Sequence, residues 1–381
     1  MSHDAPAAKI SLWLTEPLPT EVSKSLDRLA RSDDVRHVAV MADVHLAGDV
    51  CNGTVIATQD LVYPLAVGGD IGCGMLAVAC DLQVNVLSDE VAAGRVLAGL
   101  YQHVPSNKHA RAHLPNKLPT SLMATELSSP ALEKLKLRDG LFQLGTLGRG
   151  NHFVELQSDV DGRLWLMLHS GSRGMGQSIT EHHLRMTQPS ASGLGYVDAS
   201  TSAGMAYLSD LNWAIEYAMQ NRMAMAMAVE ALMRSLFAAS FDWTTLIHCH
   251  HNHVRREQHH GGELWVHRKG ALPASDDEPG VIPGSMGSRS FHVSGRGAAG
   301  ALRSSSHGAG RVLARHVARQ KVSRRDLQQQ MHGIWFDNRR ADGLRDEAPS
   351  AYKEIGRVMR AQRELTRIVR ELRPIMVYKG V

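Results

Sequence analysis

Residues 304–311 read "SSSHGAGR", a run of small residues and glycines with one imidazole, that of His307, at its centre. Glycine-rich turns of this kind expose backbone N–H groups and bind phosphate, usually with a lysine that supplies a fixed positive charge. A neutral imidazole is instead a nucleophile, and its attack on a phosphoryl group divides one transfer into two. The stretch therefore indicates phosphoryl transfer at His307. The alternative is that His307 only caps a helix that begins near Gly310.

The composition of the chain is that of a globular protein, with 381 residues, 43% hydrophobic and 21% charged. There is no uncharged apolar run of about 18 residues and no signal-peptide pattern at the start, so we expect a cytoplasmic protein without a membrane span. Four cysteines are too few for a disulfide scaffold. From Arg289 onward, 20 Lys/Arg face 8 Asp/Glu. This basic quarter could attract nucleic acid, although a solvated basic surface explains it equally well.

Strand-like segments and helical patterns follow one another without a regular βα repeat, which favours a mixed α+β fold over a doubly wound sheet. Apolar strands meeting glycine turns are expected within residues 35–46, 54–80, 141–159, 162–176, 262–272 and 288–295. One long helix rich in Ala and Met is expected over 209–240, and further helices over 310–320 and 350–372. Because the glycine loops are spread over the whole chain, we expect residues 1–381 to form one domain with a composite site.

Potential metal ligands occur where strands meet glycine turns. They are Asp70 and Cys73 in "GGDIGCGM", His152 in "GRGNHFVE", His169 in "MLHSGSRG", and His250 or His251 in "IHCHHNHV". Carboxylate, thiolate and imidazole bind divalent ions such as Zn²⁺, Mn²⁺ or Co²⁺, and one thiolate can bridge two ions. A single histidine in a turn is more often a hydrogen-bonded structural residue. Four such loops together favour a metal site, whose ion and reaction the spacing leaves open.

Several common nucleotide and hydrolase motifs are absent from the sequence. No glycine loop matches G-x-x-x-x-G-K-[ST], and no G-x-G-x-x-G opens a βαβ unit. The stretch "HSGSRG" lacks the G-x-S-x-G pattern of a nucleophile elbow. These absences exclude a Walker-type nucleotide enzyme, a dinucleotide-binding domain and an α/β-hydrolase.

Taken together, the motifs resemble those of the RtcB family of RNA ligases. The resemblance runs through "MADVHLAGDVCNGTV", "GGDIGCGM", "LGTLGRGNHFVEL", "LMLHSGSRGMG", "CHHNHVRREQHHGGELWVHRKGA", "IPGSMGSRSF", "SSSHGAGR" and "VYKGV", over about residues 38–381 and in the family's order. It implies a GTP- and Mn²⁺-dependent ligase that joins RNA 3′-phosphate or 2′,3′-cyclic phosphate ends to 5′-hydroxyl ends, in RNA repair or tRNA splicing. DNA ends are a further expected substrate, and an archease-type activator an expected partner.

The resemblance also implies the roles of individual residues. His307 would carry GMP, and two Mn²⁺ ions would be bound by Asp70, Cys73 (bridging), His152, His169 and His251, the last chosen over His250 because it directly precedes Asn252. The guanylate contacts would be Asn151 (phosphate), Glu155 (ribose), Asn252, Gly284, Ser285, Met286, Ser290, Gly308, Ala309, Gly310, Tyr352 and Lys379 (guanine). Arg173 and Arg311 would bind phosphate or the RNA end.

The chain departs from the family pattern at Ala42, where proline is usual, and around "HLAGDVCNG". Two alternatives therefore stay open. One is an enzyme that caps 3′-phosphate ends of RNA or DNA with GMP without efficient sealing. The other is a non-enzymatic metal- or RNA-binding paralogue, against which His307, Lys379 and all five ligands argue.

Overall fold

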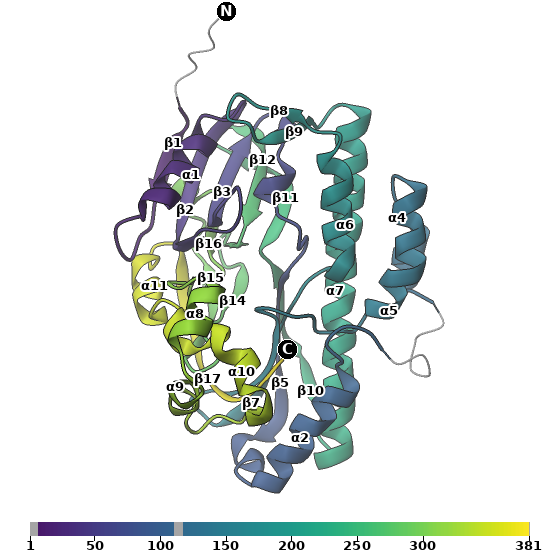
Figure 1. Ribbon diagram of the computed structural model, residues 1–381, viewed down its shortest axis with the longest axis vertical. Helices are drawn as coiled ribbons and strands as arrows, with labels where there is room; N and C mark the ends of the chain where they lie inside the picture. Colours follow the sequence, from purple (N-terminus) through teal and green to yellow (C-terminus); the bar gives the residue numbers. More distant parts are fainter. Residues whose placement is uncertain (1–6, 110–116, 381) are drawn as a thin grey trace, which may run out of the picture.

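The computed structural model describes residues 7–109 and 117–380. Two large sheets dominate it, one in the upper and one in the lower part of Figure 1, and the long helix α7 (Ser202–Phe237) stands beside them. The five-stranded sheet has the order β1 (Lys9–Leu12), β2 (Val35–His45), β3 (Asn52–Thr58), β12 (Gly262–Lys269), β11 (Asn252–His259). The seven-stranded sheet has the order β10 (Phe241–His250), β5 (Gly74–Gln83), β7 (Arg163–Ser170), β6 (Phe153–Ser158), β17 (Thr366–Lys379), β15 (Ser290–Gly295), β14 (Pro279–Ile282).

Smaller elements complete the fold. The short strands are β13 (Ala271–Pro273) with β16 (Ser304–Ser306), and β4 (Leu61–Val62), β9 (Gly195–Asp198) and β8 (Gln188–Pro189). The remaining helices are α1 (Thr20–Ala30), α2 (Glu90–His103), α3 (Thr120–Ala124), α4 (Pro130–Leu135), α5 (Leu141–Gln143), α6 (Arg173–Leu184), α8 (Arg315–Lys321), α9 (Arg324–Gln330), α10 (Ala341–Leu344) and α11 (Ile355–Ala361). The expected mixture of sheets and helices is confirmed. Among the described strands only β1 and β2 pair in parallel, so the sheets are not doubly wound.

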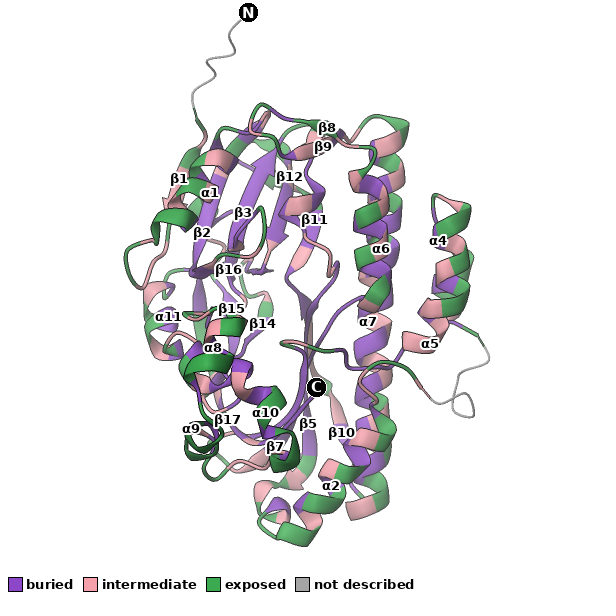
Figure 2. Ribbon diagram, viewed as in Figure 1, coloured by how far each residue is buried: buried purple, intermediate pink, exposed green. Residues whose placement is uncertain are grey.

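Both faces of the seven-stranded sheet are covered, which explains the nearly continuous apolar run of β5. On one face, alternate residues of β5, β6 and β7 pack against α2 and α7. The methionines Met225 and Met233 of α7 fill this core, as expected from the sequence. On the other face, Met75 and Met167 pack against β14, β15 and α11. Figure 2 shows the result: the strands are mostly buried, while α7 alternates between buried and exposed residues along its length.

Two expectations about the last quarter of the chain are wrong. The helical pattern over 350–372 gives helix only in α11, and residues from Thr366 onward form β17, which pairs with β6 and β15. β-Branched residues in "TRIV" and two neighbouring strands outweigh the helical spacing of the charges. The helix expected over 310–320 begins only at Arg315, with Ala314 as its N-cap. His307 therefore caps no helix and lies in the loop after β16.

The strand order brings several chain segments to one end of the seven-stranded sheet. Neighbours from β10 through β17 are antiparallel, so the start of one strand adjoins the end of the next. Gly74 at the start of β5 pairs with His250 at the end of β10, and His169 near the end of β7 pairs with both Met75 and Phe153. Lys379, the last residue of β17, also pairs with Phe153. Within the described residues, no helix is both long and apolar enough to cross a membrane.

Candidate active site

The potential metal ligands predicted from sequence converge at this end of the sheet. The Sγ atom of Cys73 lies 3.2 Å from Nε2 of His169 and 3.5 Å from Nε2 of His152. Nε2 of His152 is 2.9 Å from a carboxylate oxygen of Asp70, and Nε2 of His169 is 3.1 Å from Nε2 of His251. The five side chains form two groups that could each hold an ion, Cys73–His169–His251 and Asp70–Cys73–His152, and Cys73 belongs to both. We call these five residues the metal cluster.

The orientation of the three imidazoles fits a cation. Each ring turns Nδ1 outward to an oxygen atom: Leu147 O at 3.0 Å for His152, Asn151 O at 3.3 Å for His169, and Asn252 Oδ1 at 3.1 Å for His251. In His169 and His251 the oxygen acceptor at Nδ1 fixes the proton there, so their Nε2 atoms present lone pairs to the centre, while Nε2 of His152 faces the Asp70 carboxylate at 2.9 Å. Two such lone pairs 3.1 Å apart repel unless a cation lies between them.

Asn252 is part of this orientation. Its Nδ2 donates to Asp70 O, and its Oδ1 accepts from the N–H of Gly270, so the amide cannot be reversed without loss of both hydrogen bonds. Burial lowers the pKa of His169 and of His251 and raises that of Cys73. The protein alone therefore keeps these three groups neutral, and a bound cation would favour the thiolate form.

His250 lies on the other side of the strand. Its ring contacts that of His253, with centroids 4.8 Å apart, and its Nε2 contacts the guanidinium of Arg255. His251 alone of the two enters the metal cluster, which agrees with the choice made from the resemblance.

Two glycines of the sequence motifs are required by packing. A Cβ atom at Gly171 would lie 2.1 Å from a carboxylate oxygen of Asp70. Gly148 has φ +98°, and a Cβ there would lie 2.2 Å from Arg173 and 2.5 Å from His152. These glycines allow the backbone to lie directly against the cluster.

Two buried polar residues in the middle of α7 support the cluster, and sequence reasoning missed them. Asn221 accepts from the N–H groups of Gly145 and Thr146 and donates to Thr146 O, Ser170 Oγ and Gly171 O. Nη1 of Arg222 donates to Gly72 O and Ser170 O, both at 2.8 Å. Gly72 directly precedes Cys73, and Ser170 directly follows His169. An adjacent Asn-Arg pair inside an apolar helix was the available signal.

His307 lies beside the metal cluster, its ring centroid 4.4 Å from that of His251. Its Nδ1 is 2.7 Å from Oδ2 of Asp43, a fully buried carboxylate at the end of β2, although the geometry falls short of a hydrogen bond. The same oxygen accepts from the N–H groups of His307 and Gly308. Burial opposes ionisation of Asp43, but His307, His45 and Lys353 together outweigh it and lower the pKa of this carboxyl. Asp43 lies in the motif "MADVHLAGDVCNGTV", but the sequence analysis predicted no role for it.

A cavity of about 890 Å³ opens beside His307. Ten of the twelve predicted guanylate contacts line it: Asn151, Glu155, Gly284, Ser285, Met286, Gly308, Ala309, Gly310, Tyr352 and Lys379. The other two lie elsewhere. Asn252 orients His251, and Ser290 is buried in β15.

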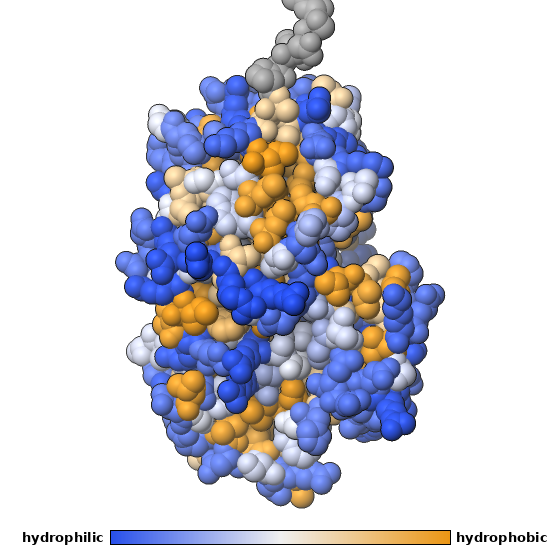
Figure 3. Space-filling view, turned by 90° about the vertical axis from the view of Figure 1, so that its left-hand side faces the viewer, coloured by the Kyte–Doolittle hydropathy of each residue, from blue (hydrophilic) through white to orange (hydrophobic). Residues whose placement is uncertain are grey.

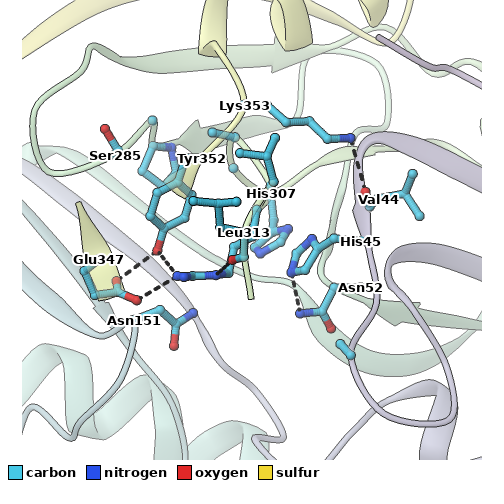
Figure 4. A pocket seen from close by; sticks show the side chains of 18 of the residues that line it. Val44, His45, Asn52, Asn151, Ser285, His307, Leu313, Glu347, Tyr352 and Lys353 are labelled. Atoms are coloured by element: carbon cyan, nitrogen blue, oxygen red, sulfur yellow. Dashed lines mark hydrogen bonds and ion pairs between the residues drawn. The ribbon is translucent and has the colours of Figure 1, made fainter. Parts of the chain in front are cut away.

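A carboxylate network occupies one wall of the cavity (Figure 4). Glu347 accepts from Lys379 at 2.8 Å, from Arg311 at 3.0 Å and from the Tyr352 hydroxyl at 2.9 Å, and also pairs with Arg315. Burial tends to raise the pKa of Glu347, but these cations lower it overall. Sequence reasoning missed Glu347. It stands in "DEAPSAYK" and looks there like one more surface acid.

The two arginines predicted for phosphate differ in their surroundings. Arg311 is committed to the carboxylate network and lies over the Tyr352 ring, 5.0 Å from its centroid. Arg173 begins α6 with φ +56° and lies beside the cluster, 3.5 Å from Nδ1 of His152. Only Arg173 thus faces the cluster itself.

The structure thus joins a cavity that contains a candidate histidine nucleophile to a group of five side chains that could hold metal ions. The family model described as "tRNA-splicing ligase RtcB" matches residues 26–380, and the chain belongs to this family. It is 34% identical to the RNA-splicing ligase RtcB of Escherichia coli over 98% of both chains. It is also similar to the RNA-splicing ligase RtcB of Mycobacterium tuberculosis (28%; 91% of this chain and 97% of the relative) and the tRNA-splicing ligase RtcB of Thermococcus kodakarensis (27%; 85% and 83%). The resemblance inferred from the motifs is confirmed.

Proposed function

We propose that this protein is a GTP-dependent RNA ligase that joins 3′-phosphate or 2′,3′-cyclic phosphate ends to 5′-hydroxyl ends. The observation that carries the proposal is His307, whose ring is 4.4 Å from that of His251 in a metal cluster shared through Cys73. Membership of the family and the similarity to named RNA-splicing ligases support it.

His307 is the proposed nucleophile. With the proton on Nδ1, facing Asp43, Nε2 keeps its lone pair for the α-phosphorus of GTP. The new N–P bond replaces the α–β phosphoanhydride bond, and pyrophosphate leaves with the electron pair. An RNA 3′-phosphate oxygen then takes the GMP from His307. Finally the 5′-hydroxyl attacks the 3′-phosphate, loses its proton and releases GMP. A cyclic end is first opened by water to the 3′-phosphate.

The remaining residues bind and orient. The backbone after His307 (Gly308–Gly310) and the Gly284–Met286 turn would bind the phosphate, while Lys379, Tyr352 and Glu155 would contact base and ribose; all of them line the cavity. Asp70, Cys73, His152, His169 and His251 would hold two Mn²⁺ ions, which when bound neutralise phosphate charge. Arg173 is the proposed cation for the RNA end.

The first test needs no RNA. The protein is incubated with Mn²⁺ and α-³²P-GTP, and the denatured chain is checked for an acid-labile, base-stable label. We expect labelling of the unmodified protein and of His316→Ala, an exposed histidine on α8, but none of His307→Ala. Label retained in His307→Ala, or no label with any of several divalent metals even when an archease-type activator is added, would contradict the proposal.

A second assay separates ligation from capping. A 3′-phosphate RNA strand is offered with and without a 5′-hydroxyl strand, in parallel with DNA strands. A ligase gives a joined product only when both strands are present. Accumulation of a GMP-capped strand without joining would favour the capping alternative.

A further inference from the structure

The cavity extends to both sides of His307. In Figure 4, Asn151, Ser285, Glu347 and Tyr352 lie on one side of this histidine, and Val44, His45, Asn52 and Lys353 lie on the other. The proposed guanylate contacts account for the first side only. The second side, which we call the outer lobe, has Val44, His45 and Asn52 in its wall; we assign to it the cavity-lining Leu46, which follows His45, and Leu14 and Leu18, which pack in the same apolar cluster as Val44. The total volume lies near the upper end of the range of small-ligand pockets, roughly 300–1,000 Å³, which leaves room for a second group beside one nucleotide.

We propose that the outer lobe binds the terminal nucleoside of the RNA 3′-phosphate end, with its unpaired base against the leucine side chains. This inference rests on the proposed function and names the place of the acceptor strand. Proteins recognise the unpaired bases of single-stranded RNA by contact with their faces and by hydrogen bonds to their edges.

The walls of the outer lobe fit a base better than a phosphate. Leu14, Leu18 and Leu46 supply apolar surface, and Leu46 is 52% exposed. Figure 3 shows the face of the molecule that lies on the left in Figure 1, where β1 and α1 are found. An apolar patch lies on this face above a strongly hydrophilic band. Leucines exposed singly are ordinary, whereas three that line one cavity beside a nucleophile form a surface for a ligand.

The polar groups of the outer lobe are neutral or already engaged. His45 directs Nδ1 to Asp43 O at 2.9 Å and Nε2 to Asn52 Nδ2 at 3.4 Å, and burial lowers its pKa to about 4. Lys353 donates to Ala42 O and Val44 O. Both ring nitrogens of His45 are thus engaged, and the Asn52 Oδ1 is left to accept a hydrogen bond from a base edge, without a free cation that would favour phosphate.

The position of the outer lobe favours the 3′-phosphate end over the 5′-hydroxyl end. Val44 and His45 directly follow Asp43, whose carboxylate contacts His307 and the N–H of Gly308. The 3′-phosphate must reach the phosphorus on His307 to accept GMP, and it remains there during sealing. A nucleoside in the outer lobe would hold its own 3′-phosphate next to His307 through both steps.

The test compares two oligoribonucleotides that end in a 3′-phosphate and differ only in whether the last nucleotide carries a base. Binding to the full-length protein is measured by fluorescence anisotropy at one salt concentration without GTP, because salt changes nucleic-acid affinity strongly. Loss of the base should weaken binding to the unmodified protein about tenfold. Leu46→Ser should bind the complete strand about fivefold more weakly than the unmodified protein does. It should bind the abasic strand with the affinity of the unmodified protein, because the effect of Leu46 depends on its contact with the base.

The matched control is Leu12→Ser, which changes an equally exposed leucine (49%) on β1 that does not line the cavity. We expect Leu12→Ser to behave as the unmodified protein with both strands. Equal binding of the complete and abasic strands by the unmodified protein overturns the inference. The inference is also overturned if Leu46→Ser weakens the binding of both strands by the same factor, which is the result that partial unfolding would give. Leu46→Ala, a milder change, is measured in parallel.

The two proposals can fail separately. If the unmodified protein forms the His307 label but the terminal base has no effect on binding, only the outer-lobe inference is wrong. If no label forms but binding depends on the base and on Leu46, the ligase proposal is wrong and the outer lobe remains an RNA-binding site.

Discussion

The metal cluster and the carboxylate network around Glu347 are both buried and polar, but their hydrogen bonds are arranged in opposite ways. In the metal cluster the protein satisfies the outward nitrogen of each imidazole and leaves the Nε2 lone pairs of His169 and His251 facing each other. In the carboxylate network, Arg311, Arg315, Tyr352 and Lys379 all turn toward Glu347 and pair with it. The first arrangement needs a cation to complete it, and the second is complete within the protein.

The difference predicts two kinds of response to mutation. Removal of one ligand from the metal cluster leaves a site that nothing else can complete. Loss of one partner from the carboxylate network leaves three others in place. We therefore expect large effects on metal affinity in the first region and smaller effects, confined to the nucleotide, in the second.

The largest effect should follow Cys73→Ser, because Cys73 belongs to both ligand groups. Loss of partners outside the ligand shell already costs 10–100-fold in metal affinity, so loss of this ligand should weaken Mn²⁺ binding by at least about 100-fold. Electron paramagnetic resonance of free Mn²⁺ measures it. Cys80→Ser, at a buried cysteine of β5, the strand that directly follows Cys73, is the control and should keep the affinity of the unmodified protein. Equal affinities of Cys73→Ser and the unmodified protein would rule out a bridging role.

A smaller loss is expected from Asn221→Ala, which leaves the cluster residues unchanged. Without the Asn221 amide the N–H groups of Gly145 and Thr146 lose their acceptor, and the loops that carry His152 and His169 lose a common anchor. Mn²⁺ affinity should fall about tenfold. The matched control is Gln220→Ala, the preceding residue, whose amide bonds to Glu216. A drop in thermal stability with unchanged Mn²⁺ affinity would show that Asn221 only stabilises the fold.

The sequence predicted the residues of the metal cluster, but it did not predict Asn221 and Arg222, which support the cluster. Asp70, Cys73, His152, His169 and His251 each stand in a short glycine motif, because local backbone geometry and ligand chemistry are encoded together. Arg222 acts on carbonyls 150 and 52 residues away, and nothing in its neighbourhood indicates those partners. The same holds for Glu347.

The end of the chain shows the same limit for secondary structure. Residues from Thr366 onward carry charges at helical spacing, yet they form β17 because β6 and β15 supply strand partners on both sides. The expected strands near the site were confirmed because their own apolar runs identified them. The order in which the strands pair, which gathers the ligands, depends on contacts between distant segments.

The carboxylate network can be tested by Lys379→Met. Lys379 lines the cavity and pairs with Glu347, which keeps Arg311, Arg315 and Tyr352 as partners after the change. The KM for GTP in self-guanylylation should rise about tenfold, the cost of one hydrogen bond to a charged group, with Mn²⁺ affinity unchanged. Arg373→Met, on an exposed position of the same strand, is the control. A fall in Mn²⁺ affinity in Lys379→Met would show that the two regions are not independent.

A further expected effect concerns stability and not ligand affinity: a pH dependence at Glu155. Burial raises its pKa to about 8 against the opposing effects of Gln157 and Lys379. A carboxyl whose pKa is higher in the folded chain contributes stability at low pH and loses it as pH rises from its ordinary value of 4.5 to about 8. Glu155→Gln cannot ionise at this position. As pH rises through this window, the temperature midpoint of its unfolding should therefore increase relative to that of the unmodified protein. At higher pH the difference between the two midpoints should stay constant. Calorimetry at several pH values measures the difference. If the difference between the two midpoints does not depend on pH, Glu155 is ionised throughout the window. Its charge would then be stabilised by Lys379, as the charge of Glu347 is stabilised by the cations of the carboxylate network.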